Sequence, residues 1–259
     1  MWLKVLVAII LFSVISPILV VIPLSFTSAS YFHFPPLGYS NRWYNSFTEN
    51  QEWIDSLFRS LNVALFTAIV STILGTMASV SVTRLNFPGK KVFMSLMVAP
   101  MIIPVIIVGI ALYHSFSSLN LIDSLVGLVL AHSILAMPIV FITVTASLKG
   151  IDRNLELAAL GLGSIPLGAF FKITLPLIRP ALFSGVLFAF ITSLDELVVT
   201  IFLVGAKTKT LPIVMWENLR TQIDPTIAAA STILIVATVV LFLLQAMIKT
   251  RASKLKQEG

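Results

Sequence analysis

The sequence predicts an all-α membrane protein with six transmembrane helices. Apolar residues make up 58% of its 259 residues and charged residues only 11%, whereas a typical soluble domain carries about 25% charged residues. Several apolar runs reach about 20 residues, the length of a helix that crosses the hydrocarbon core. These runs are continuously apolar rather than alternating, which favours helices over barrel strands. The predicted spans are 4–26, 60–83, 92–116, 124–147, 181–204 and 227–248.

The positions of Lys and Arg predict the orientation of these spans. Cytoplasmic loops of membrane proteins are enriched in both residues, and six spans bring both termini to the same side. With both termini cytoplasmic, the inner side holds Lys4, Arg84, Lys90, Lys91, Lys149, Arg153, Lys172, Arg179, Lys249, Arg251, Lys254 and Lys256. The outer side then holds only Arg42, Arg59, Lys207, Lys209 and Arg220. The net charge of +6 follows from this topology, and no basic run interleaved with aromatics indicates a nucleic-acid partner.

The chain is predicted to form a single membrane domain over residues 1–259. Its first apolar stretch is longer than the core of a signal peptide, so we expect it to remain as a helix. Cleavage after Ser28-Ala29-Ser30 is the alternative. The absence of cysteine excludes disulfides and thiolate sites. Pro100, Pro104 and Pro138 are expected to kink their helices.

The inner segment at about 148–180 is predicted to contain a short helix of its own. Asp152 or Asn154 suits the cap of that helix, and Glu156 lies in its first turn, where the helix dipole favours a negative charge. The spacing i, i+3, i+4, i+7 then puts four apolar residues on one face. These are Leu155, Ala158, Ala159 and Leu162. Such a narrow face suits a groove on another protein, and the alternative is an amphipathic turn lying on the lipid surface.

Glycine and proline predict how this segment continues. Gly161 and Gly163 weaken the helix and allow the chain to reverse. Pro166 suits the first turn of a second short helix. We expect Pro176 and Pro180 to end that helix before the fifth span begins.

The order of residues in this segment resembles the EAA loop of ABC importer permeases. The motif reads Glu-Ala-Ala, three residues, Gly, nine residues, Ile, one residue, Leu-Pro. The matching residues are Ala158, Ala159, Gly163, Ile173, Leu175 and Pro176. Leu157 stands where the motif has Glu, and Glu156 lies one residue earlier. The resemblance implies a coupling loop that docks into a cleft of a separate ATPase subunit, which binds ATP and Mg²⁺, so that no cofactor is expected in this chain.

Further motifs resemble the second-permease branch of the spermidine/putrescine-type permeases. They are Phe34-Pro35-Pro36-Leu37-Gly38-Tyr39-Ser40, Arg42-Trp43-Tyr44, Ala131-His132-Ser133, Ser193-Leu194-Asp195-Glu196 and Thr210-Leu211-Pro212. The resemblance implies a type I ABC importer permease (MetI-like) fold in a bacterial inner membrane. It also implies a heterodimer with a second permease subunit, two ATP-binding subunits and an extracytoplasmic substrate-binding protein. Polyamines or related small solutes would be the substrate.

Asp195 and Glu196 fall near the middle of the fifth apolar run. A carboxylate at the bilayer centre costs about 2.5–3.5 kcal/mol on insertion scales, so both should face protein or water. One role is a negative lining of a substrate pathway, which would suit an amine cation. The other is structural, with a carboxylate hydrogen-bonded to a neighbouring helix. For His132 and His114 we expect hydrogen-bonded packing, with a ligand or proton-relay role as the alternative.

Missing motifs also limit the function classes. The sequence contains no phosphate-binding Gly-x-x-x-x-Gly-Lys-[Ser/Thr] loop and no hydrolase or zinc-protease motif. It therefore predicts a transport subunit without its own ATPase site and without a catalytic or metal site. The rival interpretation is a secondary carrier driven by an ion gradient, for which Asp195, Glu196 and His132 would supply the ionisable groups. An assembly scaffold without transport is a third interpretation that no residue favours.

Overall fold

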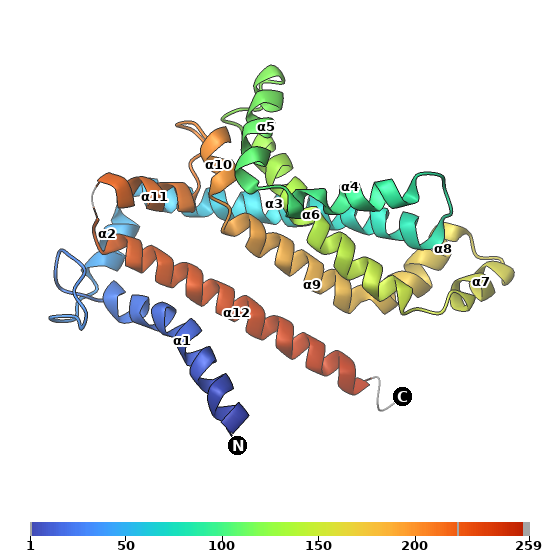
Figure 1. Cartoon of the computed structure of the whole chain (residues 1–259), viewed down its shortest axis with the longest axis horizontal. Helices are drawn as coiled ribbons and strands as arrows, with labels where there is room; N and C mark the ends of the chain where they lie inside the picture. The colour runs from blue at the N-terminus through green and yellow to red at the C-terminus, as the bar shows by residue number, and fades with distance from the viewer. Residues whose placement is uncertain (1, 222, 256–259) are drawn as a thin grey trace. The chain divides into compact units, whose positions relative to one another are not determined.

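The regular structure of the protein is helical throughout residues 2–221 and 223–255, which the computed structural model describes (Figure 1). This confirms the all-α prediction. The chain divides into two compact units. The first runs to Phe58 and resumes at Leu211–Leu241, and the second covers Arg59–Thr210 and begins again at Phe242.

Five helical segments in the described residues are long and apolar enough to cross a membrane. They are α1 (Trp2–Ser25), α3 (Gln51–Arg84), α6 (Leu125–Lys149), the continuous run Pro166–Leu194, and α12 (Thr226–Leu255). A sixth candidate is a pair of helices, α4 (Lys90–Ile102) and α5 (Val105–Ser118), bent by 107° at their junction. The predicted number of spans is reached when the bent pair counts as one span.

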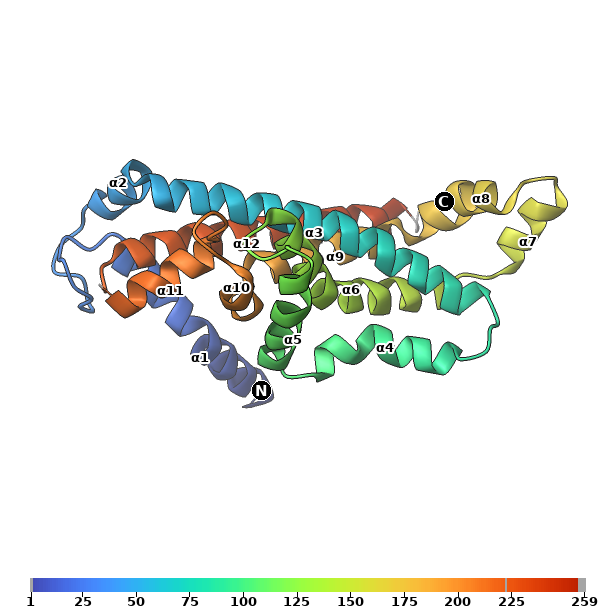
Figure 2. The same ribbon diagram turned by 90° about the horizontal axis from the view of Figure 1, so that it is seen from above.

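The bend between α4 and α5 replaces the continuous helix expected at 92–116 (Figure 2). Pro104 has no N–H to donate, and a residue before proline avoids the helical region. Ile103 accordingly takes an extended conformation, with φ −71° and ψ 133°. The expected kink at Pro104 is thus a complete break, whereas Pro138 lies inside the continuous helix α6.

The fifth span also differs from the prediction of 181–204. One helical run begins at Pro166 and passes through α8 (Pro166–Ala169), the π-helical turn η1 (Phe170–Thr174) and α9 (Leu175–Leu194). Pro176 and Pro180 do not end it. The wider π turn, in which the Leu175 N–H donates to the Phe170 carbonyl, precedes Pro176 and accommodates the missing hydrogen bond.

The core of the second unit forms where α6 meets α3 and α9 (Figure 1). Small residues let the helices approach closely, as is typical of membrane helix pairs. A Cβ on Gly75 of α3 would lie 2.9 Å from the Val140 side chain of α6. The Ser79 hydroxyl of α3 lies 3.0 Å from the Phe141 carbonyl of α6 and donates to it. The glycine at position 75 therefore permits the close contact between α3 and α6.

The core of the first unit gathers around two aromatic residues, Phe47 of α2 (Arg42–Glu49) and Trp53, whose ring centroids lie 5.7 Å apart. Helix α11 (Leu211–Thr221) and the start of α12 complete it. The apolar side chains around the pair are Leu211, Val214, Ile227 and Ala230.

Candidate functional site

The predicted short helix of the 148–180 segment is present as α7 (Asn154–Gly161). The Asn154 N–H donates to Asp152 Oδ1 at 2.9 Å, so the Asp152 side chain supports the start of the helix. The cap position itself falls on Arg153, between the two residues predicted for it, and no side chain caps the helix there.

A glycine-dependent C-terminal cap ends α7 and reverses the chain. The Ser164 N–H donates to the Ala159 carbonyl and the Gly163 N–H to the Leu160 carbonyl, each at 3.0 Å. This pair of bonds defines a Schellman motif, whose penultimate residue takes a left-handed conformation. Gly163 has φ +90°, which an L side chain adopts only with strain. The motif glycine is therefore explained by the backbone at this turn.

Glu156 of α7 points inward, where one of its carboxylate oxygens meets three donors. Glu156 Oε1 lies 2.7 Å from Arg84 Nη2, 3.0 Å from Arg84 Nε and 2.7 Å from the Thr174 hydroxyl. The Arg84 and Glu156 side chains are only 14% and 15% exposed. This contact joins α7 to the end of α3 and to η1. Sequence reasoning missed both partners, because 72 and 18 residues separate them from Glu156.

The apolar residues of α7 remain exposed. Leu157, which replaces the Glu of the EAA motif, is 50% exposed, and Leu162 at the end of the helix is 90% exposed. Of the other residues on the predicted face, Leu155 and Ala158 are exposed and Ala159 is half-buried. Contiguous exposed apolar surface marks a contact with another protein or with lipid.

The second half of the EAA-like spacing lies in the helical run instead of on that surface. Ile173 and Pro176 are half-buried, and Leu175 packs against the core where α6 meets α9. The first half of the motif therefore forms an exposed helix, and the second half attaches that helix to the membrane core.

Asp195 and Glu196 lie at a helix break, not in the middle of a helix as the sequence predicted. Helix α9 ends at Leu194, and the short helix α10 (Val198–Leu203) begins three residues after Asp195. Glu196 Oε1 accepts a hydrogen bond from the Val199 N–H at 2.8 Å and so caps α10. The Asp195 carboxylate is exposed and accepts no hydrogen bond from the described residues. The two carboxylates thus occupy different environments.

His132 of α6 is buried next to this break. Its Nδ1 lies 2.8 Å from the Ser193 hydroxyl, and its Nε2 lies 2.9 Å from the Thr200 hydroxyl. The two partners stand on either side of the break. The prediction of hydrogen-bonded packing is confirmed for His132 but not for His114, which is exposed on α5. Within the residues that the structure describes, no group of three His, Asp or Glu side chains is placed to hold a metal ion.

Asp123, in the turn between α5 and α6, holds the segment that follows α10. Asp123 Oδ1 accepts hydrogen bonds from the Gly205 N–H at 3.1 Å, the Lys207 N–H at 3.2 Å and the Thr208 hydroxyl at 2.7 Å. The Thr208 hydroxyl above all, followed by these backbone N–H groups, lowers the pKa of the Asp123 carboxyl, against the opposing effect of burial.

Comparison with known proteins gives the family of the chain. Residues 71–254 match the family described as "Binding-protein-dependent transport system inner membrane component". The chain belongs to this family. It is 34% identical over 224 residues to the putrescine transport system permease protein PotI of Escherichia coli K12, a match that covers 84% of this chain and 80% of the relative. It is 31% identical over 211 residues to the spermidine/putrescine transport system permease protein PotC of Haemophilus influenzae, which covers 82% of each chain.

Solved structures share the fold of this permease. A chain of a bacterial alginate ABC transporter, crystallised with a periplasmic protein that carries an alginate pentasaccharide, matches 98% of this chain and 94% of its own length, with a TM-score of 0.74 and 15% identity. A chain of an amino acid ABC transporter matches 81% of this one with a TM-score of 0.62. The fold is that of a type I ABC importer permease, as the sequence predicted, and the protein is a multi-pass membrane permease subunit.

Proposed function

We propose that this permease is the membrane subunit of an ATP-driven importer for a polyamine such as putrescine or spermidine. Relatives that bear those names are 30–34% identical over most of the chain, which supports this substrate class. Transport is by alternating access, for which the chain needs two arrangements of its helices rather than a reactive group. It has no ATPase site or enzymatic activity of its own.

The exposed apolar helix α7 is the coupling element and carries this proposal. Leu157, Ala158 and Leu162 present apolar surface, and the left-handed Gly163 turns the chain back toward the membrane core. A separate ATPase subunit, with ATP and Mg²⁺ bound to it, receives this helix in a cleft. Closure of the ATPase dimer then moves the 148–180 segment and, through the continuous helix Pro166–Leu194, the helices of the membrane.

The Asp195 carboxylate lines the substrate pathway. It lies at a break between two helices, is exposed and accepts no hydrogen bond from the described residues, so its charge is available to a cation. A polyamine carries several ammonium groups, which a carboxylate binds with charge-assisted hydrogen bonds. Glu196 caps α10 and contributes negative potential next to it.

The complete transporter contains two permease subunits as a heterodimer, two ATP-binding subunits and an outer binding protein. Both termini face the cytoplasm of a bacterial cell, which the excess of Lys and Arg in the inner loops supports. Lys256 lies outside the described residues, as do the side chains of Lys249, Arg251 and Lys254. Arg84, Lys90, Lys149 and Arg153 lie at helix ends that the proposal puts on the cytoplasmic side.

Co-purification tests the coupling element. Ala158→Leu and Gly163→Val should each remove the ATPase subunit from the chain purified from its host, because a bulky side chain no longer fits the cleft or the left-handed turn. Ala146→Leu, at an exposed alanine of α6 outside the 148–180 segment, is the matched control and should leave co-purification unchanged. ATPase recovery that is equal in all three variants would disprove docking through α7.

Uptake kinetics test the pathway. Asp195→Asn should reduce putrescine or spermidine uptake while the ATPase still co-purifies, and Asp195→Glu, which keeps the charge, should retain most of the activity. Transport kinetics of Asp195→Asn that match those of the parent would remove Asp195 from the substrate pathway.

A further inference from the structure

A hydrogen-bonded chain through His132 spans the break between α9 and α10. Ser193 lies in the last turn of α9 and Thr200 in α10, and His132 of α6 contacts both hydroxyls. Ser193, His132 and Thr200 are 4%, 1% and 0% exposed. Asp195 and Glu196 lie between the two hydroxyl-bearing residues in the sequence. The imidazole therefore holds the two sides of the segment that carries the candidate pathway carboxylate.

The hydrogen bonds of Thr200 show that Nε2 of His132 carries a proton. The Thr200 hydroxyl lies 3.0 Å from the Glu196 carbonyl and donates its single proton to it. Thr200 Oγ1 must then accept from His132, so Nε2 carries a proton. Nδ1 lies 2.8 Å from the Ser193 hydroxyl, which is able to donate to it or accept from it. The two contacts use both ring nitrogens, and the contact with Thr200 requires a proton on Nε2.

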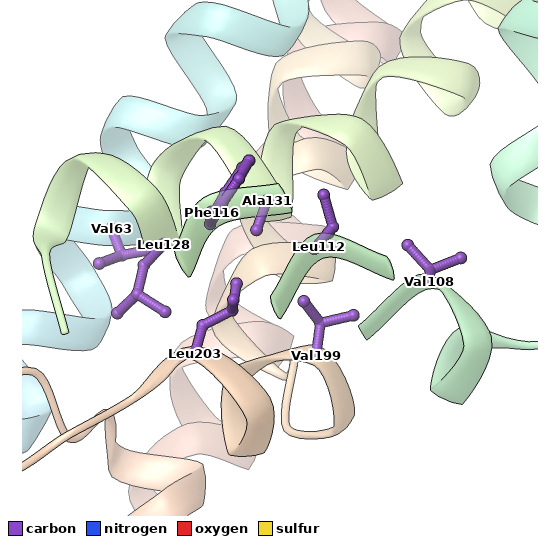
Figure 3. Packing of buried hydrophobic residues seen from close by; sticks show 8 residues of the cluster. All are labelled: Val63, Val108, Leu112, Phe116, Leu128, Ala131, Val199 and Leu203. Atoms are coloured by element: carbon purple, nitrogen blue, oxygen red, sulfur yellow. The ribbon is translucent and has the colours of Figure 1, made fainter. Parts of the chain in front are cut away.

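Helix α10, which follows the break at Asp195, packs against α5, which follows the bend at Pro104. Val199 and Leu203 of α10 contact the same apolar cluster as Val108 and Leu112 of α5 (Figure 3). A Cβ on Gly109 of α5 would lie 2.5 Å from the Phe202 ring of α10, so the two helices are in close contact. Since α5 follows the 107° bend at Pro104, neither helix continues directly from a long span. The hydrogen bond to Thr200 attaches this pair to α6.

We propose that His132 is a positioning residue that fixes the Asp195 carboxylate in the substrate pathway. Apolar packing alone would fill the same space, whereas the imidazole gives direction: it fixes Ser193 and Thr200 at 2.8 Å and 2.9 Å from opposite ring nitrogens. Because Asp195 lies between Ser193 and Thr200 in the sequence, these two hydrogen bonds also set the position of its carboxylate. The inference rests on the proposed role of Asp195, and it assigns the neighbouring histidine to orientation of the break, not to proton transfer.

Uptake kinetics in proteoliposomes with the complete transporter test this role. Thr200→Val removes the hydroxyl and keeps the shape of the side chain, and His132→Gln keeps one donor and one acceptor. Each should raise the KM for putrescine uptake about tenfold, the equivalent of about 1.4 kcal/mol or roughly one buried hydrogen bond, with little change in the ATPase rate stimulated by the binding protein. Thr200→Ser should restore KM, and His114→Leu, at an exposed histidine, should leave it unchanged. A KM at the parent value in both Thr200→Val and His132→Gln would overturn the proposal, as would an equal fall in uptake and ATPase activity.

Accessibility of the break separates this proposal from the role of Asp195. The chain has no cysteine, so a single Leu197→Cys reports on the break alone, with Asn86→Cys in the exposed turn before α4 as the control. His132→Gln should increase maleimide labelling at position 197 several-fold and leave position 86 unchanged. If labelling rises while Asp195→Asn transports normally, the positioning role of His132 is supported and the assignment of Asp195 to the pathway fails. Unchanged labelling at position 197 would overturn the positioning role of His132 itself.

Discussion

At the scale of single residues, the contact around Glu156 shows how one carboxylate fixes α7, the proposed coupling helix. Its oxygen receives three hydrogen bonds from two residues, and both charged side chains are largely buried. Removing one member of a buried ion pair is costly, because the other charge stays desolvated. The exposed Leu157 next to it is free to contact a partner. The EAA motif has its glutamate at the position of Leu157. In this chain the glutamate is one residue earlier, at Glu156, where it supports α7 from inside.

Arg84→Gln should therefore weaken binding of the ATPase subunit without altering the docking surface. Loss of one partner of a buried pair costs about 3–5 kcal/mol, part of which appears as displacement of α7, so we expect affinity for the ATPase to fall at least about tenfold. Affinity measured in detergent with the isolated ATPase subunit checks this result. Lys91→Gln, at an exposed lysine near the same turn, is the control. An Arg84→Gln affinity equal to that of Lys91→Gln would contradict the supporting role of the pair.

The hydrogen bonds that the Asp123 carboxylate accepts from residues 205–208 predict that the stability of this segment depends on pH. The pKa of the Asp123 carboxyl in the folded protein lies below the usual value of about 3.9. The ionised carboxylate therefore stabilises the fold fully when the pH is above about 3.9. This stability is lost as the pH falls from about 3.9 through the folded pKa. Amide hydrogen exchange of residues 205–208 should accelerate over this acid range. Asp123→Asn should exchange quickly at every pH and lose the acid transition, and a transition that persists in this variant would assign it to another group.

The sequence identified Glu156 and His132 but not the residues that bind them. Each is a polar group in or beside an apolar stretch, which is a local signal. Their partners come from other helices, with sequence separations of 61 residues for His132–Ser193 and 72 for Glu156–Arg84. No pattern within a single helix encodes such distances, so only the folded chain brings these pairs together.

At the scale of elements, breaks in helices distinguish the structure from the predicted topology. Hydropathy treats 92–116 and 181–204 as continuous spans, because the apolar residues continue through both breaks. At Pro104 the helix breaks, because proline lacks an N–H and restricts the conformation of Ile103 before it; the result is the 107° bend. At Asp195 the only local signal is the pair of carboxylates. The π turn before Pro176 had no recognisable signal in the sequence.

The cap of α7 allows a prediction with a matched pair of glycines. Gly163 has φ +90°, while Gly161, two residues earlier in the helix, has ordinary helical geometry, and a Cβ at either position meets nothing within 4 Å. Gly163→Ala should therefore cost about 1–2 kcal/mol through backbone strain alone, whereas Gly161→Ala should stabilise α7 by up to about 1 kcal/mol.

ATPase binding should then respond in opposite directions to the two substitutions. Affinity should fall several-fold for Gly163→Ala and stay equal or rise for Gly161→Ala. Because the added methyl group is the same, a similar loss in both variants would mean that this surface tolerates no added methyl group, and it would contradict the role assigned to the left-handed turn.

At the scale of the whole molecule, composition predicted the fold class well. The low fraction of charged residues and the length of the apolar runs indicated a helical membrane protein, and the family and the solved structures confirm it. Apolar surface remains exposed on α1 and on α7. Lipid and other subunits are the partners expected for such surfaces. The proposed heterodimer, ATPase subunits and binding protein account for them within one transport complex.

Reconstitution in liposomes tests the central claim, that this chain transports only as the permease of an ATP-driven importer. We expect putrescine or spermidine uptake when the chain is combined with its second permease, the ATPase subunits and the binding protein, and we expect it to require ATP on the side of the ATPase. Uptake should cease with Gly163→Val, which prevents coupling but leaves the membrane helices intact. Uptake by the lone chain without ATP, driven by a proton or sodium gradient, would contradict the account and identify a secondary carrier.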